Sequence, residues 1–303
     1  MSRFLTAGVL SQQTGLPFYL LSVHDTNVVR KFSPSGIEID TYTTGGNTYR
    51  SIAIFSNGNF VAGDETDSNP QVRYFNSSGS QQWTYNYGGR VRDVFIDGNE
   101  NVYVVGLATN VVKLNSSGSH QWTFTGHTEN IDGVAVDNSG NVYTAARDGA
   151  KKLNSSGSQQ WHYNLGDRVR CVAIDASGNV YLGGDDGSVR KLNNSGSLQW
   201  NHSFGGAVRG VAVDSDGNVY AGNTNGDVRK LNSSGTSQWT YTGHSDTVFD
   251  TEIDINGNIW TASGDGSIRQ LNPSGTLLQT ISGLTRVDDI AIFPGVYERT
   301  FNP

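Results

Sequence analysis

The fold is decided by the stretch from Val169 to Ser203, which reads VRCVAIDASGNVYLGGDDGSVRKLNNSGSLQWNHS. It contains four short runs of strand-forming residues, and each pair of runs is separated by a turn rich in Gly, Asn, Asp and Ser. Gly and Asn tolerate the positive φ that tight hairpins need. The stretch therefore predicts four antiparallel strands in a row, at Val169–Asp175, Val180–Gly184, Ser188–Asn193 and Ser197–Ser203.

The same pattern recurs along almost the whole chain. A phrase of the form Asn-Ser-Ser-Gly-Ser-x-Gln-Trp returns every 39 residues, with its tryptophan at Trp83, Trp122, Trp161, Trp200 and Trp239. A second phrase resembling VAVDxSGNVY alternates with it, and both phrases occur seven times if degenerate copies are included. Four strands repeated at about 40 residues are typical of a β-propeller.

The two ends of the repeat array complement each other. Arg286–Phe293 reads as a first strand with no later strands, whereas Phe18–Val23, Asn27–Phe32 and Ile37–Thr43 read as three strands that lack a first. Pairing them would close the ring and remove exposed sheet edges. We therefore predict an all-β, seven-bladed β-propeller over residues 16–295, with four antiparallel strands per blade. Its last blade is closed by N-terminal strands plus a C-terminal strand, and tails at 1–15 and 296–303 lie outside the ring.

Composition excludes several classes of protein. The chain has 303 residues and a formal net charge of −7, which argues against binding nucleic acid by bulk electrostatics. Met1–Gly15 is too short and interrupted for a signal peptide, and no apolar run is long enough to insert into a membrane. The single cysteine, Cys171, excludes an internal disulfide and a cysteine-built zinc site. We expect a soluble protein of the cytoplasm or of a virus particle.

Three segments resemble known propeller families. Val189–Trp200 resembles the tryptophan-docking repeat of the quinoprotein-like (PQQ-like) propellers. Thr242–Val248, followed by Thr261–Ile268, resembles a WD-repeat blade, and Gly210–Tyr220 is similar to NHL repeats. The resemblance implies the propeller fold but little about function. Catalytic quinoproteins place adjacent cysteines and calcium beside the quinone, so the isolated Cys171 implies no quinone cofactor here.

The repeated tryptophans and polar turns have structural interpretations. We predict that Trp83, Trp122, Trp161, Trp200 and Trp239 pack between blades, and the alternative is a set of sugar-stacking platforms. The turn residues Asp137, Asp175, Asp214 and Asp254 favour hairpin turns over calcium loops, because no bidentate glutamate follows. By the WD resemblance, His127 and His244 hydrogen-bond to Asp148 and Asp265. No metal site and no catalytic residues are assigned.

The most informative set is one position near the start of each innermost strand. The seven residues at this position are Arg50, Arg92, Asp132, Arg170, Arg209, Phe249 and Asp288. With nearby Arg90, Arg168 and Arg286, the arginines are predicted to line the rim of the central channel, where they could bind a carboxylate, phosphate or acidic glycan. The alternative is that the arginines pair with the loop acids Asp93, Asp167, Asp185 and Asp186, or that they are simply solvated.

These observations predict a non-enzymatic interaction module or scaffold that binds a protein partner or a surface glycan. One concrete version is a component of a virus particle, either decorating a capsid or recognising a host, with the terminal tails joining the assembly. A multivalent lectin is the first alternative. The second is a lyase or hydrolase at the channel mouth, for which Asp250, Asp288 and Asp289 are the candidate acids. The segment Glu65–Pro70 is an insertion that mildly breaks the repeat symmetry.

Overall fold

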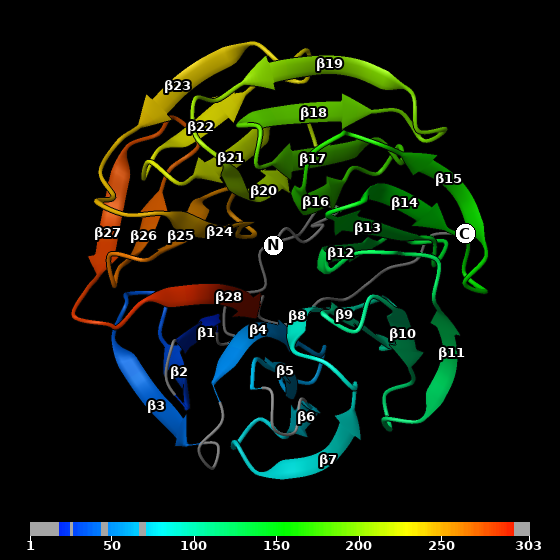
Figure 1. Ribbon diagram of the computed structural model, residues 1–303. Helices are drawn as coiled ribbons and strands as arrows, with labels where there is room; N and C mark the ends of the chain where they lie inside the picture. The colour runs from blue at the N-terminus through cyan, green and yellow to red at the C-terminus, as the bar shows by residue number, and fades with distance from the viewer. Residues whose placement is uncertain (1–17, 25–26, 44–47, 67–70, 294–303) are drawn as a thin grey trace.

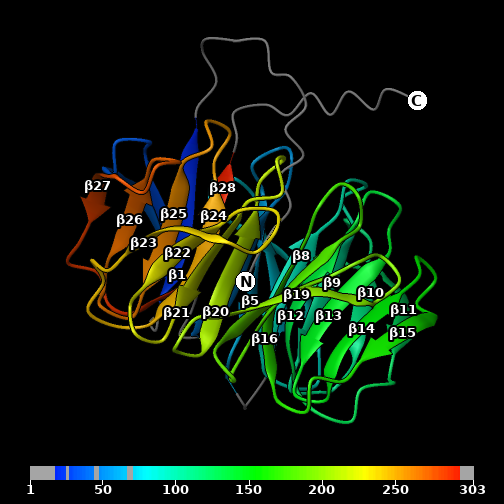
Figure 2. The same ribbon diagram turned by 90° about the horizontal axis from the view of Figure 1, so that it is seen from above.

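The computed structural model describes residues 18–24, 27–43, 48–66 and 71–293. Its strands form seven four-stranded antiparallel sheets arranged as blades around a central axis (Figure 1). Seen edge-on, the strands run from one face of the ring to the other (Figure 2). The predicted seven-bladed propeller is confirmed. The described part of the chain contains no helix long and apolar enough to span a bilayer.

In six of the blades the innermost strand comes first in the chain and the outermost strand last. Three blades contain β4 (Tyr49–Ile54), β5 (Phe60–Asp64), β6 (Gln71–Phe75) and β7 (Gln81–Asn86); β8 (Val91–Ile96), β9 (Val102–Gly106), β10 (Val111–Leu114) and β11 (His120–Phe124); and β12 (Ile131–Val136), β13 (Val142–Ala146), β14 (Gly149–Leu153) and β15 (Gln159–Tyr163). The next three contain β16 (Val169–Ile174), β17 (Val180–Gly184), β18 (Ser188–Leu192) and β19 (Leu198–Ser203); β20 (Val208–Val213), β21 (Val219–Asn223), β22 (Val228–Leu231) and β23 (Ser237–Tyr241); and β24 (Val248–Ile253), β25 (Ile259–Ser263), β26 (Ile268–Leu271) and β27 (Leu277–Ile281).

The remaining blade joins the two ends of the array. It consists of β28 (Val287–Phe293), β1 (Tyr19–His24), β2 (Val28–Phe32) and β3 (Glu38–Thr43), in that order from the axis outward. β1 and β28 are antiparallel, and Leu20 lies opposite Ile292. The predicted closure is confirmed, and the strand boundaries differ from the predicted ones by at most one residue. The predicted tails lie outside the described residues.

The residue types along each strand match the burial of that strand in its blade. The second strand of every blade is buried throughout, because neighbouring blades cover both of its faces. The outermost strands are mostly exposed, and alternate residues are half-buried. On six of the innermost strands, β4, β8, β12, β16, β20 and β24, the second residue is only half-buried between buried neighbours. This is the position that the sequence assigns to the channel rim.

A row of polar and aromatic side chains crosses the blade formed by β16–β19. Lys191 on β18 lies opposite both Tyr181 on β17 and Trp200 on β19. Its ammonium group is 5.3 Å from the centre of the Tyr181 ring. The Tyr181 hydroxyl donates a 2.9 Å hydrogen bond to Asp175 Oδ2 in the β16–β17 turn. The row therefore ties the outer strand to the turn next to the inner strand, and three other blades repeat it.

The repeated tryptophans join each blade to the next. Trp200 Nε1 donates a 3.1 Å hydrogen bond to the Ser233 carbonyl of the following blade. Its indole lies against the turn glycine Gly235, where a Cβ would come within 2.7 Å of the ring and where φ is +82°. Only glycine fits this close approach in that conformation. Trp83, Trp122, Trp161 and Trp239 make the equivalent contact.

The two blade junctions without a repeated tryptophan use other residues for the same bond. The Tyr42 ring lies against Gly79, and its hydroxyl donates to the Ser77 carbonyl at 3.1 Å. At the other junction, Gln279 Nε2 donates to the Pro34 carbonyl at 2.6 Å. All seven blade junctions therefore carry a hydrogen bond from an outer strand to the same turn carbonyl of the next blade.

The sixth tryptophan, Trp260, has a different place. It lies on β25, in the position that a tyrosine occupies in four other blades, and it is fully buried. Its Nε1 donates a 3.0 Å hydrogen bond to Asp254 Oδ2, which also accepts from Gln270. This blade therefore has its tryptophan in the interior, whereas the repeated tryptophans of other blades lie on the outermost strand.

Candidate binding site at the channel mouth

Seven residues line an opening at one end of the central channel, and they are the seven that the sequence places at equivalent positions. They are Arg50, Arg92, Asp132, Arg170, Arg209, Phe249 and Asp288. Each is the second residue of an innermost strand, so neighbouring blades bury the residues on either side while this one faces the axis. The opening encloses about 420 Å³, including the part that is open to solvent.

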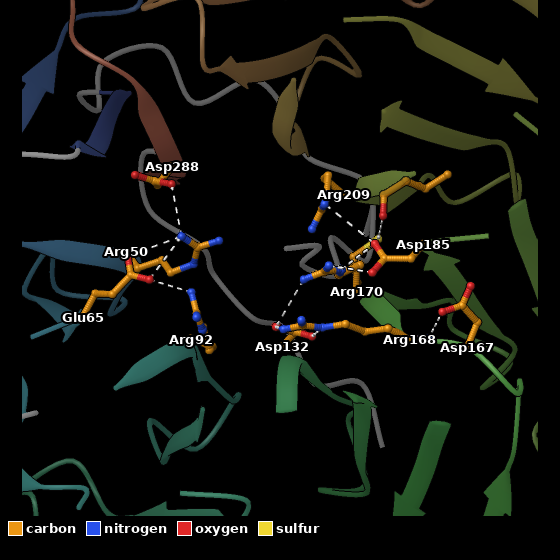
Figure 3. A network of polar contacts seen from close by, with 12 residues as sticks. Arg50, Glu65, Arg92, Asp132, Asp167, Arg168, Arg170, Asp185, Arg209 and Asp288 are labelled. Carbon is orange, nitrogen blue, oxygen red and sulfur yellow. Dashed lines mark hydrogen bonds and ion pairs between the residues drawn. The ribbon is translucent and has the colours of Figure 1, made fainter. Parts of the chain in front are cut away.

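Two neighbouring arginines share one carboxylate on one side of the mouth. Glu65, which directly follows β5, accepts a 2.5 Å hydrogen bond from Arg92 Nη1 and lies 3.3 Å from Arg50 Nη1. Arg50 Nη1 is also 3.6 Å from Asp288. We call Arg50, Glu65 and Arg92 the first clip (Figure 3). Because one carboxylate serves two guanidinium groups, the clip carries an excess of one positive charge.

The other side of the mouth repeats this arrangement. Asp185, which directly follows β17 just as Glu65 follows β5, accepts from Arg170 Nε at 2.7 Å and from Arg170 Nη2 at 2.6 Å. Arg209 Nη2 lies 3.7 Å from the same carboxylate. We call Arg170, Asp185 and Arg209 the second clip (Figure 3). The hydrogen bonds from Arg170 to Asp185 are bidentate, which is the strongest geometry for an arginine and a carboxylate.

The remaining charged residues of the mouth are tightly paired. Arg168, which precedes β16, donates to both oxygens of Asp132 at 2.5 Å through Nε and Nη2. Arg286 donates to Asp288 Oδ1 at 2.6–2.9 Å and stacks over the Phe249 ring, 4.2 Å from its centre. These pairs fix Asp132 and Asp288 on the rim.

Burial and like charges oppose ionisation of two of the arginines. Burial, and then the neighbouring guanidinium of Arg50, lowers the pKa of Arg92. Burial, and then Arg170, lowers the pKa of Arg209. Burial also acts against the charge of Arg168, but the bidentate bond to Asp132 outweighs it and the pKa of Arg168 is raised. Positive charge is therefore compensated at Arg168 and crowded at Arg92 and Arg209.

Several predicted rim residues lie elsewhere. Arg168 pairs with Asp132 but does not itself line the opening, and neither do Arg286 and the half-buried Arg90. Among the loop acids considered as partners, Asp185 contacts rim arginines, whereas Asp186 pairs with Arg190. The Asp167 carboxylate accepts the Arg168 backbone N–H. Glu65 was missed as a rim residue because, in the sequence, it opens the insertion that breaks the repeat.

Three other acids of the inner strands are buried deeper in the ring. Asp93 accepts the Val134 N–H at 2.9 Å, and Asp289 accepts the Ile52 N–H at 2.8 Å. Asp250 accepts a 3.2 Å hydrogen bond from a backbone N–H of β28. Each carboxylate therefore joins its inner strand to the inner strand of the next blade. Asp93 consequently lies one residue beyond the rim, because side chains alternate along a strand.

The two Gly-His histidines lie in buried polar clusters. His127 Nδ1 is 2.6 Å from Asp148, and its Nε2 is 2.8 Å from the Thr144 hydroxyl. His244 contacts Asp265 and Thr261 in the same way, at 3.1 and 2.8 Å. Both sets lie between strands of a single blade. No group of three or more potential metal-ligating His, Cys, Asp or Glu residues occurs within the described ranges.

The turn aspartates have their oxygens occupied by protein donors. Asp175 Oδ1 accepts the backbone N–H groups of Ser177 and Asn179, both at 2.9 Å. Its Oδ2 accepts from the Asn179 amide and the Tyr181 hydroxyl. Donor hydrogens point at the oxygen atoms that a calcium ion would need. This geometry is that of a hydrogen-bonded hairpin turn.

The pairing of Arg168 with Asp132 leads to a stability prediction. We expect Asp132→Asn to lower the free energy of unfolding by about 1–2 kcal/mol, because it leaves a partly buried arginine without its bidentate partner. Urea denaturation at pH 7 measures this loss. The matched control is Asp216→Asn on an exposed turn, for which the change should stay within about 0.5 kcal/mol. Equal effects of the two substitutions would contradict a structural role for the Arg168–Asp132 pair.

The comparisons with known proteins agree with this architecture. Residues 127–277 match the family model described as outer membrane protein assembly factor BamB. Among solved structures, that of U3-55K superposes with a TM-score of 0.73 over 84% of this chain and 90% of the other, at 16% sequence identity. At this identity the likeness concerns the fold only. No curated protein sequence matches the chain. The chain is a seven-bladed β-propeller, and its residues 127–277 are similar to the repeats of the PQQ-like family.

Proposed function

We propose that the protein is a non-enzymatic interaction module, a rigid ring that binds a partner protein at the mouth of its channel. The observation that carries this proposal is the convergence of four arginines from four different blades on one opening. Guanidinium groups held on rigid strands at the centre of a face are suited to recognising acidic groups of a partner. The matched family model supports the proposal, since its description names an assembly factor.

The state of the carboxylates favours binding over catalysis. A hydrolase or lyase would use a pair of acids with separate acid and base roles. At the mouth, Asp132 and Asp288 are each held by an arginine, at Arg168 and Arg286. Asp250 and Asp289 accept backbone N–H groups inside the ring. We therefore assign these acids to the architecture of the ring.

The packing of the repeated tryptophans argues against the lectin alternative. Each indole of the repeated set lies against a turn glycine of the next blade, so one of its faces is covered. A sugar would have to stack on what remains of a half-buried ring, beside the lysine and tyrosine of the same row. A protein partner is accordingly the occupant that we propose.

A narrower version of the proposal places the protein in a virus particle, as a capsid decoration or as part of a host-recognition device. The uniform blades suit a rigid spacer in such an assembly. The terminal segments 1–15 and 296–303, predicted from the sequence to join the particle, lie outside the described residues. Purified particles from the natural source, probed with an antibody against the ring, test this version. Absence of the chain from the particles would overturn it.

The interaction proposal is tested with the full chain, tagged and recovered from its natural source at physiological salt after mild cross-linking. We expect a defined partner that, when purified separately, forms a complex with the chain in size-exclusion chromatography. The complex should dissociate as the salt concentration rises, because charged contacts are screened. A chain that remains monomeric with every recovered candidate, or that turns over a small substrate, would contradict the proposal.

A further inference from the structure

We propose that Arg50 and Arg92 of the first clip bind a carboxylate carried by an acidic segment of the partner, whereas Arg168 and Arg170 only hold the mouth in shape. This inference rests on the proposed function and narrows it to one side of the opening. It assigns different roles to arginines that occupy equivalent or neighbouring positions in the repeat.

The hydrogen bonds of the two pairs of arginines differ. Arg168 and Arg170 each use Nε and Nη2 on both oxygens of one carboxylate, at 2.5–2.7 Å. Arg50 reaches its acids through Nη1 alone, at 3.3–3.6 Å. Within the described residues, Arg92 donates to Glu65 through Nη1 alone. The first clip therefore keeps donor groups that a second carboxylate could use.

Both clips carry an excess of positive charge, since each holds two arginines against one carboxylate, and the unused donor groups of Arg50 distinguish the first clip. Arg50 and Arg92 share Glu65, so the clip holds two positive charges against one negative charge. Their side chains are about one-fifth exposed, enough to be reached from the mouth but partly removed from water. Burial and the proximity of Arg50 lower the pKa of Arg92, which records the crowding. An incoming carboxylate would relieve this repulsion, and in a partly buried site the attraction exceeds that of a surface pair.

The rest of the rim favours a carboxylate on a peptide over a polyanion. Asp288 lies 3.6 Å from Arg50, and Asp132 stands beside Arg92 in the ring. These two acids would repel the successive charges of a nucleic acid or a polyphosphate. A peptide offers both a side-chain carboxylate for the arginines and backbone N–H donors for the aspartates. Phe249 adds an apolar surface to the same opening.

The test uses a fluorescein-labelled peptide of alternating glycine and glutamate, eight residues long, with the matched glycine–glutamine peptide as the neutral probe. Fluorescence polarisation with the full chain is expected to show binding of the glutamate peptide only. Arg50→Ala and Arg92→Ala should each weaken that binding about tenfold or more, since each removes a charge-assisted donor. Arg30→Ala, which removes an arginine paired with Glu38 on β2 and β3, is the matched control and should leave binding unchanged.

Glu65→Gln gives a readout that a purely structural role would not produce. It removes the carboxylate that now occupies the clip, so the affinity for the glutamate peptide should rise at least threefold. Thermal unfolding of every variant shows whether the ring is intact. If Arg92→Ala fails to fold, Arg92→Lys takes its place, and loss of the planar donor fork should still weaken binding.

Three results would overturn the inference. The first is binding of the glutamine peptide as tight as that of the glutamate peptide. The second is unchanged binding in a folded Arg50→Ala, Arg92→Ala double variant. The third is competition by inorganic phosphate or glucuronate at lower concentrations than by the glutamate peptide, which would assign the clip to another anion. If a purified partner binds the double variant as tightly as the natural chain, the inference fails while the proposed function stands.

Discussion

Acidification from pH 7 to pH 4 is expected to remove roughly 9 kcal/mol from the free energy of unfolding, about 3 kcal/mol for each of three buried histidines. Burial lowers the pKa of His24, His127 and His244 from 6.5 to about 4. The folded ring therefore disfavours the proton that the unfolded chain accepts. This stability is fully present above pH 6.5 and is lost as the pH falls from 6.5 toward 4. The loss is comparable with the total stability of an ordinary domain.

The environments of the histidines explain why the effect of burial on their pKa values is only partly offset. His24 is completely buried, and after burial the nearby Arg30 contributes most to lowering its pKa. The carboxylate of Asp148 raises the pKa of His127, but less than burial lowers it. Asp265 acts on His244 in the same way. Protonation would place a charge among strands where water cannot reach it.

Urea denaturation at half-unit steps between pH 7.5 and 4 measures the effect. The double variant His127→Gln, His244→Gln should show a flatter pH dependence, with roughly two thirds of the acid-induced loss removed. His120→Gln, on an exposed outer strand, is the matched control and should follow the natural chain. A double variant with the same pH dependence as the natural chain would show that other groups drive acid unfolding.

Trp260→Ala is expected to be the most destabilising of the six tryptophan substitutions, at about 4 kcal/mol. The ring is completely buried, and its removal also takes a hydrogen-bond donor from Asp254. Trp239→Ala, at the half-buried edge of the preceding blade, should cost about 2 kcal/mol, because part of its ring is in water already. Chemical denaturation at pH 7 compares the two variants.

Trp260→Tyr is the matched control for the interior site. Tyrosine occupies the corresponding position in four other blades, where its hydroxyl donates to the turn aspartate, as Tyr220 does to Asp214 at 3.1 Å. The substitution should therefore cost less than about 1.5 kcal/mol. If Trp239→Ala proved as costly as Trp260→Ala, the contacts between blades would matter more than the interior of this blade.

The fold was predictable because the repeat states it many times. Each copy of the pattern places strand-forming residues and turn glycines at the same intervals. The strands of a degenerate copy can therefore be assigned by comparison with the clearer copies. The equivalence of Arg50, Arg92, Arg170 and Arg209 was visible for the same reason, and the structure brings all four to one opening. A periodic sequence thus fixes which residues occupy corresponding places around a ring.

The exceptions to the repeat could not be predicted in this way. Asp40 and Gln279 stand where other blades have tryptophan, so the sequence leaves open how those junctions are joined. Tyr42, two residues beyond Asp40, reaches the same turn carbonyl. The outer strand presents alternate residues to the same face, and a neighbour two positions away can take over the contact.

The pairing within the mouth also depends on three-dimensional detail. The sequence offers many acids near the arginines, and their partners are selected by the direction in which each loop leaves its strand. Glu65 and Asp185 occupy the same position after the second strand of their blades, a correspondence that the insertion after Glu65 conceals in the sequence. Recognising that correspondence would have identified both clips from the sequence.

The union of β1 with β28 has a consequence for biosynthesis. Strands β1 to β3 leave the ribosome early, but the partner of β1 is not made until residues 287–293 appear. Throughout most of translation, β1 exposes an unsatisfied apolar edge that other nascent chains could join. A circularly permuted gene that starts at β4 and joins residue 293 to residue 18 through a short linker would make every blade from contiguous sequence. Such a permutant should fold faster and aggregate less during synthesis.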